Sequence, residues 1–184
     1  MQYIKRRLLL IALGIIVFLI SYSIGSIIPL DRDYSQKLKN TFIEKVSNIN
    51  YVGIFMNNLL ISLFMFVPLL GTIFGLFSGF STGNVFHALS INSPILSQIS
   101  PLVILITPFG ILEMFSYGIA ISRSAIIFFK LLKRKSLIPE ILPTLLEIGI
   151  VALLLFIGAV IESSIISKLG THNSTSVQLL NRTV

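Results

Sequence analysis

An uncharged, strongly apolar stretch of about 23 residues runs from Leu8 to Leu30, directly after the basic sequence KRR. About 20 apolar residues in a helix span the hydrocarbon core of a bilayer. Hydrophobic residues make up 54% of the 184 residues and charged residues only 11%, which is more apolar surface than a soluble domain of this size can bury. The sequence therefore predicts an all-α, polytopic integral membrane protein whose main partner is the lipid bilayer.

The N-terminal segment has the general form of a signal peptide, because basic residues precede an apolar run. However, the run over 8–30 is longer than a typical signal core, and no clear small-residue cleavage site follows it. We therefore expect a retained first transmembrane helix.

The apolar segments predict a single transmembrane domain over residues 1–169 with about five helical spans. These spans are residues 8–30, 51–74, 93–108, 110–129 and 141–166. Between the first two spans, residues 31–50 mix both charge signs with apolar residues at roughly helical spacing. This pattern suits an amphipathic helix on the outer surface, and a plain solvated loop is the alternative.

Two sets of helix-perturbing residues indicate how the spans pack. Gly71, Gly75 and Gly79 recur every fourth residue, which lines one helix face with small residues and favours close helix approach. Residues 81–100 are uncharged and only moderately apolar, with Gly83 and Pro94 inside, and they begin the segment 81–112. We expect a hairpin there, broken by proline and glycine and shielded by other helices.

Positive charge predicts the orientation in the cell membrane. KRR at 5–7 and KLLKRK at 130–135 flank apolar segments, so both are expected to be cytoplasmic. Five spans then place the N-terminus inside and the polar tail, 170–184, outside. A hairpin at 95–128 that only dips into the bilayer, leaving three full spans, fits the charges equally. In an extracytoplasmic tail, the sequons at Asn173 and Asn181 are candidate glycosylation sites.

Ionisable residues inside apolar segments need a physical explanation, because a charge at the bilayer centre costs roughly 2.5–3.5 kcal/mol. Arg123 lies roughly 15 Å along a helix from Lys133, and Glu147 lies roughly 12 Å from Pro139. Their depths match on consecutive helices joined by a short turn. We therefore predict an intramembrane Arg123–Glu147 ion pair with a structural role, whereas Glu162 is expected near the headgroups.

Glu113 has two interpretations. It follows Pro108 and Gly110, so it is expected in the first turn of a helix, where unpaired N–H groups favour a carboxylate. The other interpretation is a transport or partner-binding role, with Asn57 and Asn58 as polar companions.

The sequence contains no recognisable catalytic, metal or cofactor site. It has no cysteine, no Gly-rich phosphate loop and no nucleophile with a base at readable spacing. His87 is interpreted as a helix-packing residue rather than a ligand, and His172 lies in a different context. The net charge of +7 comes from segment ends rather than from a basic domain, which argues against nucleic-acid binding. We expect a non-enzymatic protein without cofactors.

Residues 50–128 resemble the stage II sporulation protein M family. The similarity lies in FMNN at 55–58, GTIFG at 71–75, GNVFHAL at 83–89 and TPFGILEMFSYGIAISRS at 107–124. The family's Pro-His-Gly-x-x-Glu motif corresponds to Pro108, Gly110 and Glu113, with weaker matches at Asn58, Gly71 and Gly75. Phe109 stands where the family usually has histidine, and GN at 83–84 replaces the usual order.

The resemblance implies a polytopic, non-enzymatic component of about five spans. The sporulation member works with cell-wall hydrolases in membrane migration during engulfment, and many other members have no settled role. We therefore expect a scaffold or accessory subunit of a larger complex with other membrane proteins. The alternative is a channel or transporter component that uses Glu113 at a broken hairpin. The isoleucine-rich, cysteine-free composition and the sequons are compatible with an archaeal source.

Overall fold

The computed structural model describes residues 2–47, 49–91, 93 and 96–180, and it confirms the predicted all-α class for this part of the chain. The helices are α1 (Gln2–Ile27), α2 (Arg32–Ser47), α3 (Tyr51–Phe66), α4 (Leu70–Ile91), the 3-10 turn η1 (Leu96–Gln98), α5 (Leu102–Ile106), α6 (Pro108–Leu132) and α7 (Ile138–Leu180). Among the described residues, three helical segments are long and apolar enough to cross a membrane: Ile4–Ile27, Pro108–Leu132 and Ile138–Ser167.

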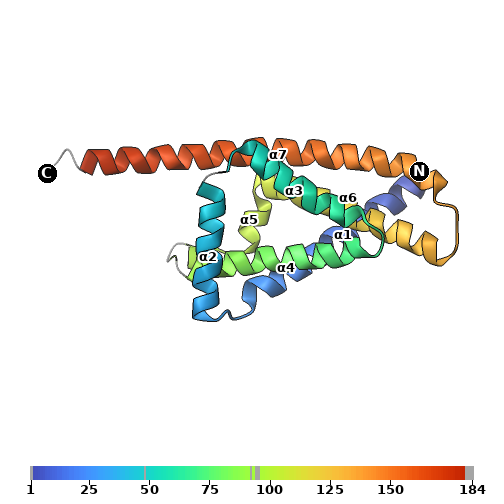
Figure 1. The fold of residues 1–184 in the computed structure, drawn as a ribbon, viewed down its shortest axis with the longest axis horizontal. Helices are drawn as coiled ribbons and strands as arrows, with labels where there is room; N and C mark the ends of the chain where they lie inside the picture. The colour runs from blue at the N-terminus through green and yellow to red at the C-terminus, as the bar shows by residue number, and fades with distance from the viewer. Residues whose placement is uncertain (1, 48, 92, 94–95, 181–184) are drawn as a thin grey trace.

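The long helices form an elongated bundle, which Figure 1 shows with the two termini toward opposite ends of its long axis. Helix α1 packs along α4, and α6 packs against both α1 and α7. Helix α3 lies against α4, α6 and α7, while α2 packs on α4. The shared core contains Phe18, Tyr22, Met65, Tyr117 and Leu155, all of them buried. Aromatic and aliphatic side chains from α1, α3, α6 and α7 therefore meet in one interior.

Glycines set the distance between the helices. A Cβ atom added at Gly79 would lie 2.8 Å from the Phe18 carbonyl oxygen, and one at Gly83 would lie 2.2 Å from the Tyr22 carbonyl oxygen. These backbones approach so closely that no larger residue fits without a shift. The small-residue face predicted over 71–79 therefore continues to Gly83, and its Gly79 and Gly83 pack α4 against α1.

The segment 51–74, expected as one span, is divided into two helices. Helix α3 ends at Phe66 and α4 begins at Leu70. Pro68 lacks the N–H group that a continuing helix needs, and Leu69 adopts a φ of 67°, which turns the chain back. Helices α3 and α4 consequently lie side by side, with Phe64 stacked on Phe74 at a centroid distance of 5.2 Å.

The broken hairpin begins later than the sequence indicated. Helix α4 passes through Gly83 without interruption and ends at Ile91, because Gly83 is used for packing rather than as a break. Pro94 lies outside the described residues. Among the described residues of the expected span 93–108, Leu102–Ile106 forms a short α-helix and Pro108 already belongs to α6. Pro101 precedes the short helix, and Thr107, with an extended ψ of 152°, ends it. The actual break lies between α4 and α6.

Helix α2 resolves one alternative left by the sequence, because residues Arg32–Ser47 are helical rather than a loop. In Figure 1, α2 stands across one end of α4. Helix α7 includes Pro143 in its first part and continues to Leu180, so its backbone is helical through most of the segment predicted as the polar tail.

Candidate functional site

The structure brings Arg123 and Glu147 together. The Arg123 Nε and Nη2 groups donate to the Glu147 Oε2 and Oε1 atoms at 2.7 and 2.5 Å. The Arg123 side chain is only 1% exposed. A guanidinium group matches a carboxylate through two parallel hydrogen bonds, so the geometry is that of the predicted pair between α6 and α7.

The pair is part of a larger cluster that the sequence did not reveal. Arg7 on α1 also binds Glu147 through two hydrogen bonds of 2.6 and 2.7 Å, and it donates to the Ser122 hydroxyl at 2.8 Å. Glu140 accepts hydrogen bonds from Arg123 and from Lys130, both at 2.5 Å. We call these five ionisable residues, Arg7, Arg123, Lys130, Glu140 and Glu147, the charged layer.

The charged layer joins the three helices that are long enough to cross a membrane. Glu147 lies between two guanidinium groups, and Glu140 lies between Arg123 and Lys130. Each carboxylate therefore has two cationic partners, which lowers the cost of placing it among apolar helices. The sequence assigned Arg7 only to the basic N-terminal cluster, because no pattern in KRR distinguishes a residue that turns inward from its neighbours.

Glu113 lies in the second turn of α6 rather than in its first. Thr107 is the N-cap residue, and its hydroxyl accepts a hydrogen bond from the Gly110 N–H at 3.2 Å. Pro108 occupies the first turn, which favours a helix start there. The Gly110 N–H at the start of α6 is thus capped by Thr107 and not by Glu113. The helix-start interpretation of Glu113 was wrong, and its partner is the Asn58 side chain on α3, at 2.5 Å.

Glu113 ends a chain of hydrogen bonds that starts at the surface. The Lys45 ammonium on α2 donates to the Asn57 Oδ1 atom at 2.7 Å. The Asn57 amide nitrogen donates to the Asn58 Oδ1 atom at 3.1 Å. The Lys45 ammonium can only donate and the Glu113 carboxylate can only accept. Each asparagine therefore accepts through its Oδ1 atom on the Lys45 side and donates through its amide nitrogen on the Glu113 side. This hydrogen-bond chain connects α2, α3 and α6.

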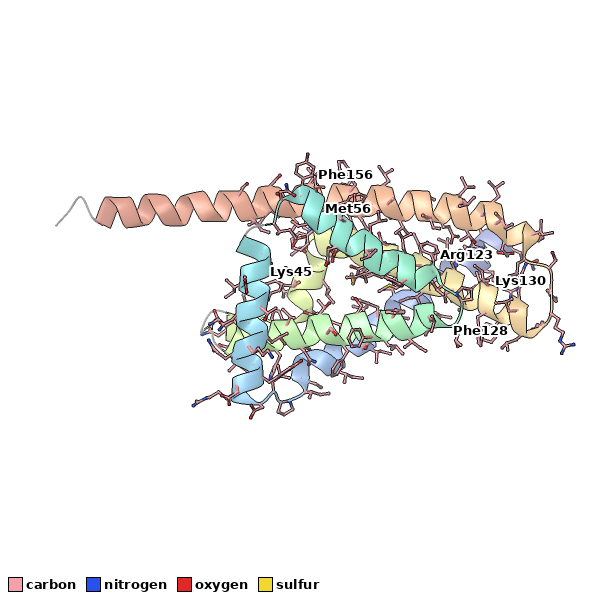
Figure 2. The ribbon with its side chains drawn as sticks, viewed as in Figure 1. Lys45, Met56, Arg123, Phe128, Lys130 and Phe156 are labelled. Atoms are coloured by element: carbon pink, nitrogen blue, oxygen red, sulfur yellow. The ribbon has the colours of Figure 1, made fainter. Side chains whose placement is uncertain are left out.

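The hydrogen-bond chain runs along the wall of a cavity of about 350 Å³. We call it the Glu113 cavity. Most of its lining is aromatic or aliphatic and comes from α1 to α7. Its polar lining residues include Lys45, Asn57, Asn58, Glu113 and Glu162. Figure 2 places Lys45 far along the bundle from Arg123 and Lys130, so the cavity and the charged layer are separate sites.

The remaining predicted residues are His87, Asn173 and Asn181. His87 on α4 does not line the Glu113 cavity. The backbone of Asn173 belongs to α7, and Asn181 lies outside the described residues, so both glycosylation sites stay predictions. Within residues 2–47, 49–91, 93 and 96–180, no group of three or more histidine and acidic side chains is placed to hold a metal ion.

A comparison with protein-family models matches residues 8–166 to Stage II sporulation protein M. The chain belongs to the stage II sporulation protein M family. It is a membrane protein of that family, since the match covers nearly all of the three described helical segments that are long and apolar enough to cross a bilayer. No curated protein and no solved structure matches the chain.

The residues that carry the resemblance to the stage II sporulation protein M family converge in the fold. Asn58 and Glu113 form the hydrogen bond between α3 and α6. A Cβ at Gly110 would lie 2.5 Å from the Ile104 carbonyl oxygen, so this glycine permits the sharp turn between α5 and α6. Gly71 and Gly75 face Ser124 and Ile121 of α6. Phe109, at the position usual for histidine, lines the Glu113 cavity.

Proposed function

We propose that this stage II sporulation protein M family member is a non-enzymatic scaffold or accessory subunit of a larger membrane complex. The charged layer carries this proposal. Its carboxylates are each held by two cations of the same chain, so the layer serves to fix α1, α6 and α7 rather than to bind a substrate. The fixed bundle then offers its outer surface to other membrane proteins.

The outer surface supports this role. Helix α7 has a row of apolar side chains that face away from the bundle, and Leu145, Leu146 and Leu153 are each about 60% exposed. Helix α1 has a similar face that includes Leu8 and Leu9. In a bilayer these faces contact lipid or the helices of other subunits, whose association depends on close packing.

The test is purification of the tagged, full-length protein from its native membrane in mild detergent. We expect other membrane proteins to elute with it in fixed stoichiometry. Leu146→Trp on α7 and Leu9→Trp on α1 enlarge the two faces separately, and one of them should release the partner while the charged layer stays intact. A protein that elutes alone, or a partner that neither variant releases, contradicts the scaffold role.

A channel or transporter component is the second candidate, and the Glu113 cavity favours it. Two acidic residues and two asparagines line this partly open cavity between the helices, as in sites that bind ions between helices. Reconstitution in proteoliposomes with ion-flux measurement tests this candidate. Flux that Glu113→Gln abolishes would support transport, whereas equal flux with and without the protein would exclude it.

A further inference from the structure

The Glu113 cavity has the size and lining of a small-molecule site. Its volume of about 350 Å³ lies at the lower end of the roughly 300–1,000 Å³ typical of ligand pockets. Phe18, Phe42, Phe86 and Phe109 contribute aromatic surface to its wall. A pocket of this volume suits one hydrocarbon chain of a ligand.

The acidic groups of the Glu113 cavity have few partners. Glu113 accepts a hydrogen bond from Asn58. Among the described residues, the Glu162 carboxylate on α7 has no hydrogen-bond or salt-bridge partner, although it lines the same cavity. Carboxylates in apolar surroundings are stabilised when a cation or a donor lies beside them. The cavity therefore has an unmet requirement for positive charge.

Lys45 adds the opposite charge at the same cavity. Its ammonium group donates to Asn57, and two further N–H donors are left for another acceptor. The cavity thus combines a largely apolar lining, two carboxylates and one ammonium group. This arrangement complements an amphiphile that carries both a cation and an anion in its headgroup.

We propose that the Glu113 cavity binds an aminophospholipid, with one acyl chain among the aromatic side chains and the primary ammonium group at Glu113 and Glu162. Lys45 holds the phosphate. A primary ammonium has three N–H donors, as the lysine side chain has, whereas the trimethylated headgroup of a choline lipid has none. The site therefore distinguishes ethanolamine from choline lipids. This inference does not depend on the scaffold role, because a bound lipid fits a transporter equally.

The first experiment compares lipids with identical acyl chains. The full-length protein is equilibrated in detergent with equal amounts of phosphatidylethanolamine, phosphatidylcholine and phosphatidylglycerol, and native mass spectrometry measures the lipid that stays bound. We expect about tenfold more phosphatidylethanolamine than phosphatidylcholine, as one charge-assisted hydrogen bond provides. Equal retention of the three lipids, or a preference for phosphatidylglycerol, overturns the proposal.

Variants locate the binding to the cavity. Glu162→Gln removes a carboxylate that has no protein partner among the described residues, so it is expected to fold, and it should reduce the ethanolamine preference about tenfold. Val85→Phe fills the cavity and should lower retention of every lipid. Asp33→Asn removes an acidic residue of α2 outside the cavity and is the matched control. If Glu162→Gln behaves like Asp33→Asn, the proposal fails.

A soluble headgroup separates lipid binding from simple amine binding. Phosphoethanolamine is added to the protein that carries bound phosphatidylethanolamine, at a concentration a hundredfold above the lipid. We expect the lipid to stay bound, because the acyl chain contributes to the affinity through apolar burial. Complete displacement by the soluble compound contradicts an amphiphile site.

Discussion

Arg123 and Glu147 meet through two parallel hydrogen bonds although 24 residues of chain separate them. The same carboxylate also receives two hydrogen bonds from Arg7, so a single side chain of α7 holds α1 and α6 together. Because the partners of Glu147 belong to different helices, substitutions in the charged layer should change the free energy of unfolding of the whole bundle.

Replacement of Glu147 is expected to be the most destabilising change in the charged layer. In Glu147→Leu, two guanidinium groups lose their shared carboxylate, and Arg7 keeps only the Ser122 hydroxyl and the Ile119 carbonyl. Removing one partner of a buried ion pair costs about 3–5 kcal/mol. Denaturant titration of the purified protein in detergent measures this loss. Unchanged unfolding would show that the layer does not stabilise the bundle.

Arg7 and its neighbour Arg6 provide a matched comparison. Arg7→Gln removes the hydrogen bonds to Glu147 and Ser122, and we expect a loss of about 1.5–3 kcal/mol, because Arg123 still pairs with Glu147. Arg6 is exposed, so Arg6→Gln should change the unfolding free energy by less than about 0.5 kcal/mol. Equal effects of the two variants would mean that Arg7 acts only through its charge.

The glycine face of α4 predicts a contrast between two alanine substitutions. Gly83→Ala places a methyl group against the Tyr22 carbonyl, and overpacking of this kind costs about 1–3 kcal/mol. A Cβ at Gly149 on α7 meets no atom within 4 Å, so Gly149→Ala should stabilise the helix by about 0.5–1 kcal/mol. Melting temperatures in detergent should therefore move in opposite directions. A shift in the same direction contradicts the close packing of α1 on α4.

Asn58 and Glu113 are expected to be coupled. Asn58→Leu removes the amide donor to Glu113, which leaves a polar group without its partner at a cost of about 1–3 kcal/mol. Glu113→Leu in the same chain removes that unsatisfied group, so the double variant should lose less than the sum of the single variants. A double-mutant cycle of unfolding free energies measures the difference. Strict additivity would show that the hydrogen bond does not form in the folded protein.

Much of the helical architecture could be predicted from the sequence, because long apolar runs and glycine spacing are local signals. The α3–α4 turn shows where local signals fail. Pro68 is visible in the sequence, but proline is common in membrane helices, and nothing nearby indicates the left-handed conformation of Leu69. The packing of α3 against α4, which no local pattern in the sequence shows, favours the turn at Pro68 and Leu69.

The sequence predicts only part of the candidate site, because only part of the site is visible in local sequence patterns. Matching helix depths in the sequence are enough to predict Arg123 opposite Glu147. Arg7 joins them from a helix far away in sequence, and depth alone did not distinguish it from Arg6. The partner of Glu113 also depended on tertiary structure, because α3 brings Asn58 to it from 55 residues away.

The glycines of α4 make the length of this helix as important as its composition. Successive residues of an α-helix are rotated by about 100° around its axis. One inserted or deleted residue between Gly71 and Gly83 would therefore rotate the glycines on one side of the change relative to those on the other side. Some of them would then no longer face α1 or α6. Substitutions on the outer side of α4 leave that alignment intact. Helix α4 is therefore expected to tolerate many changes of side chain in its evolution but no change in the number of residues.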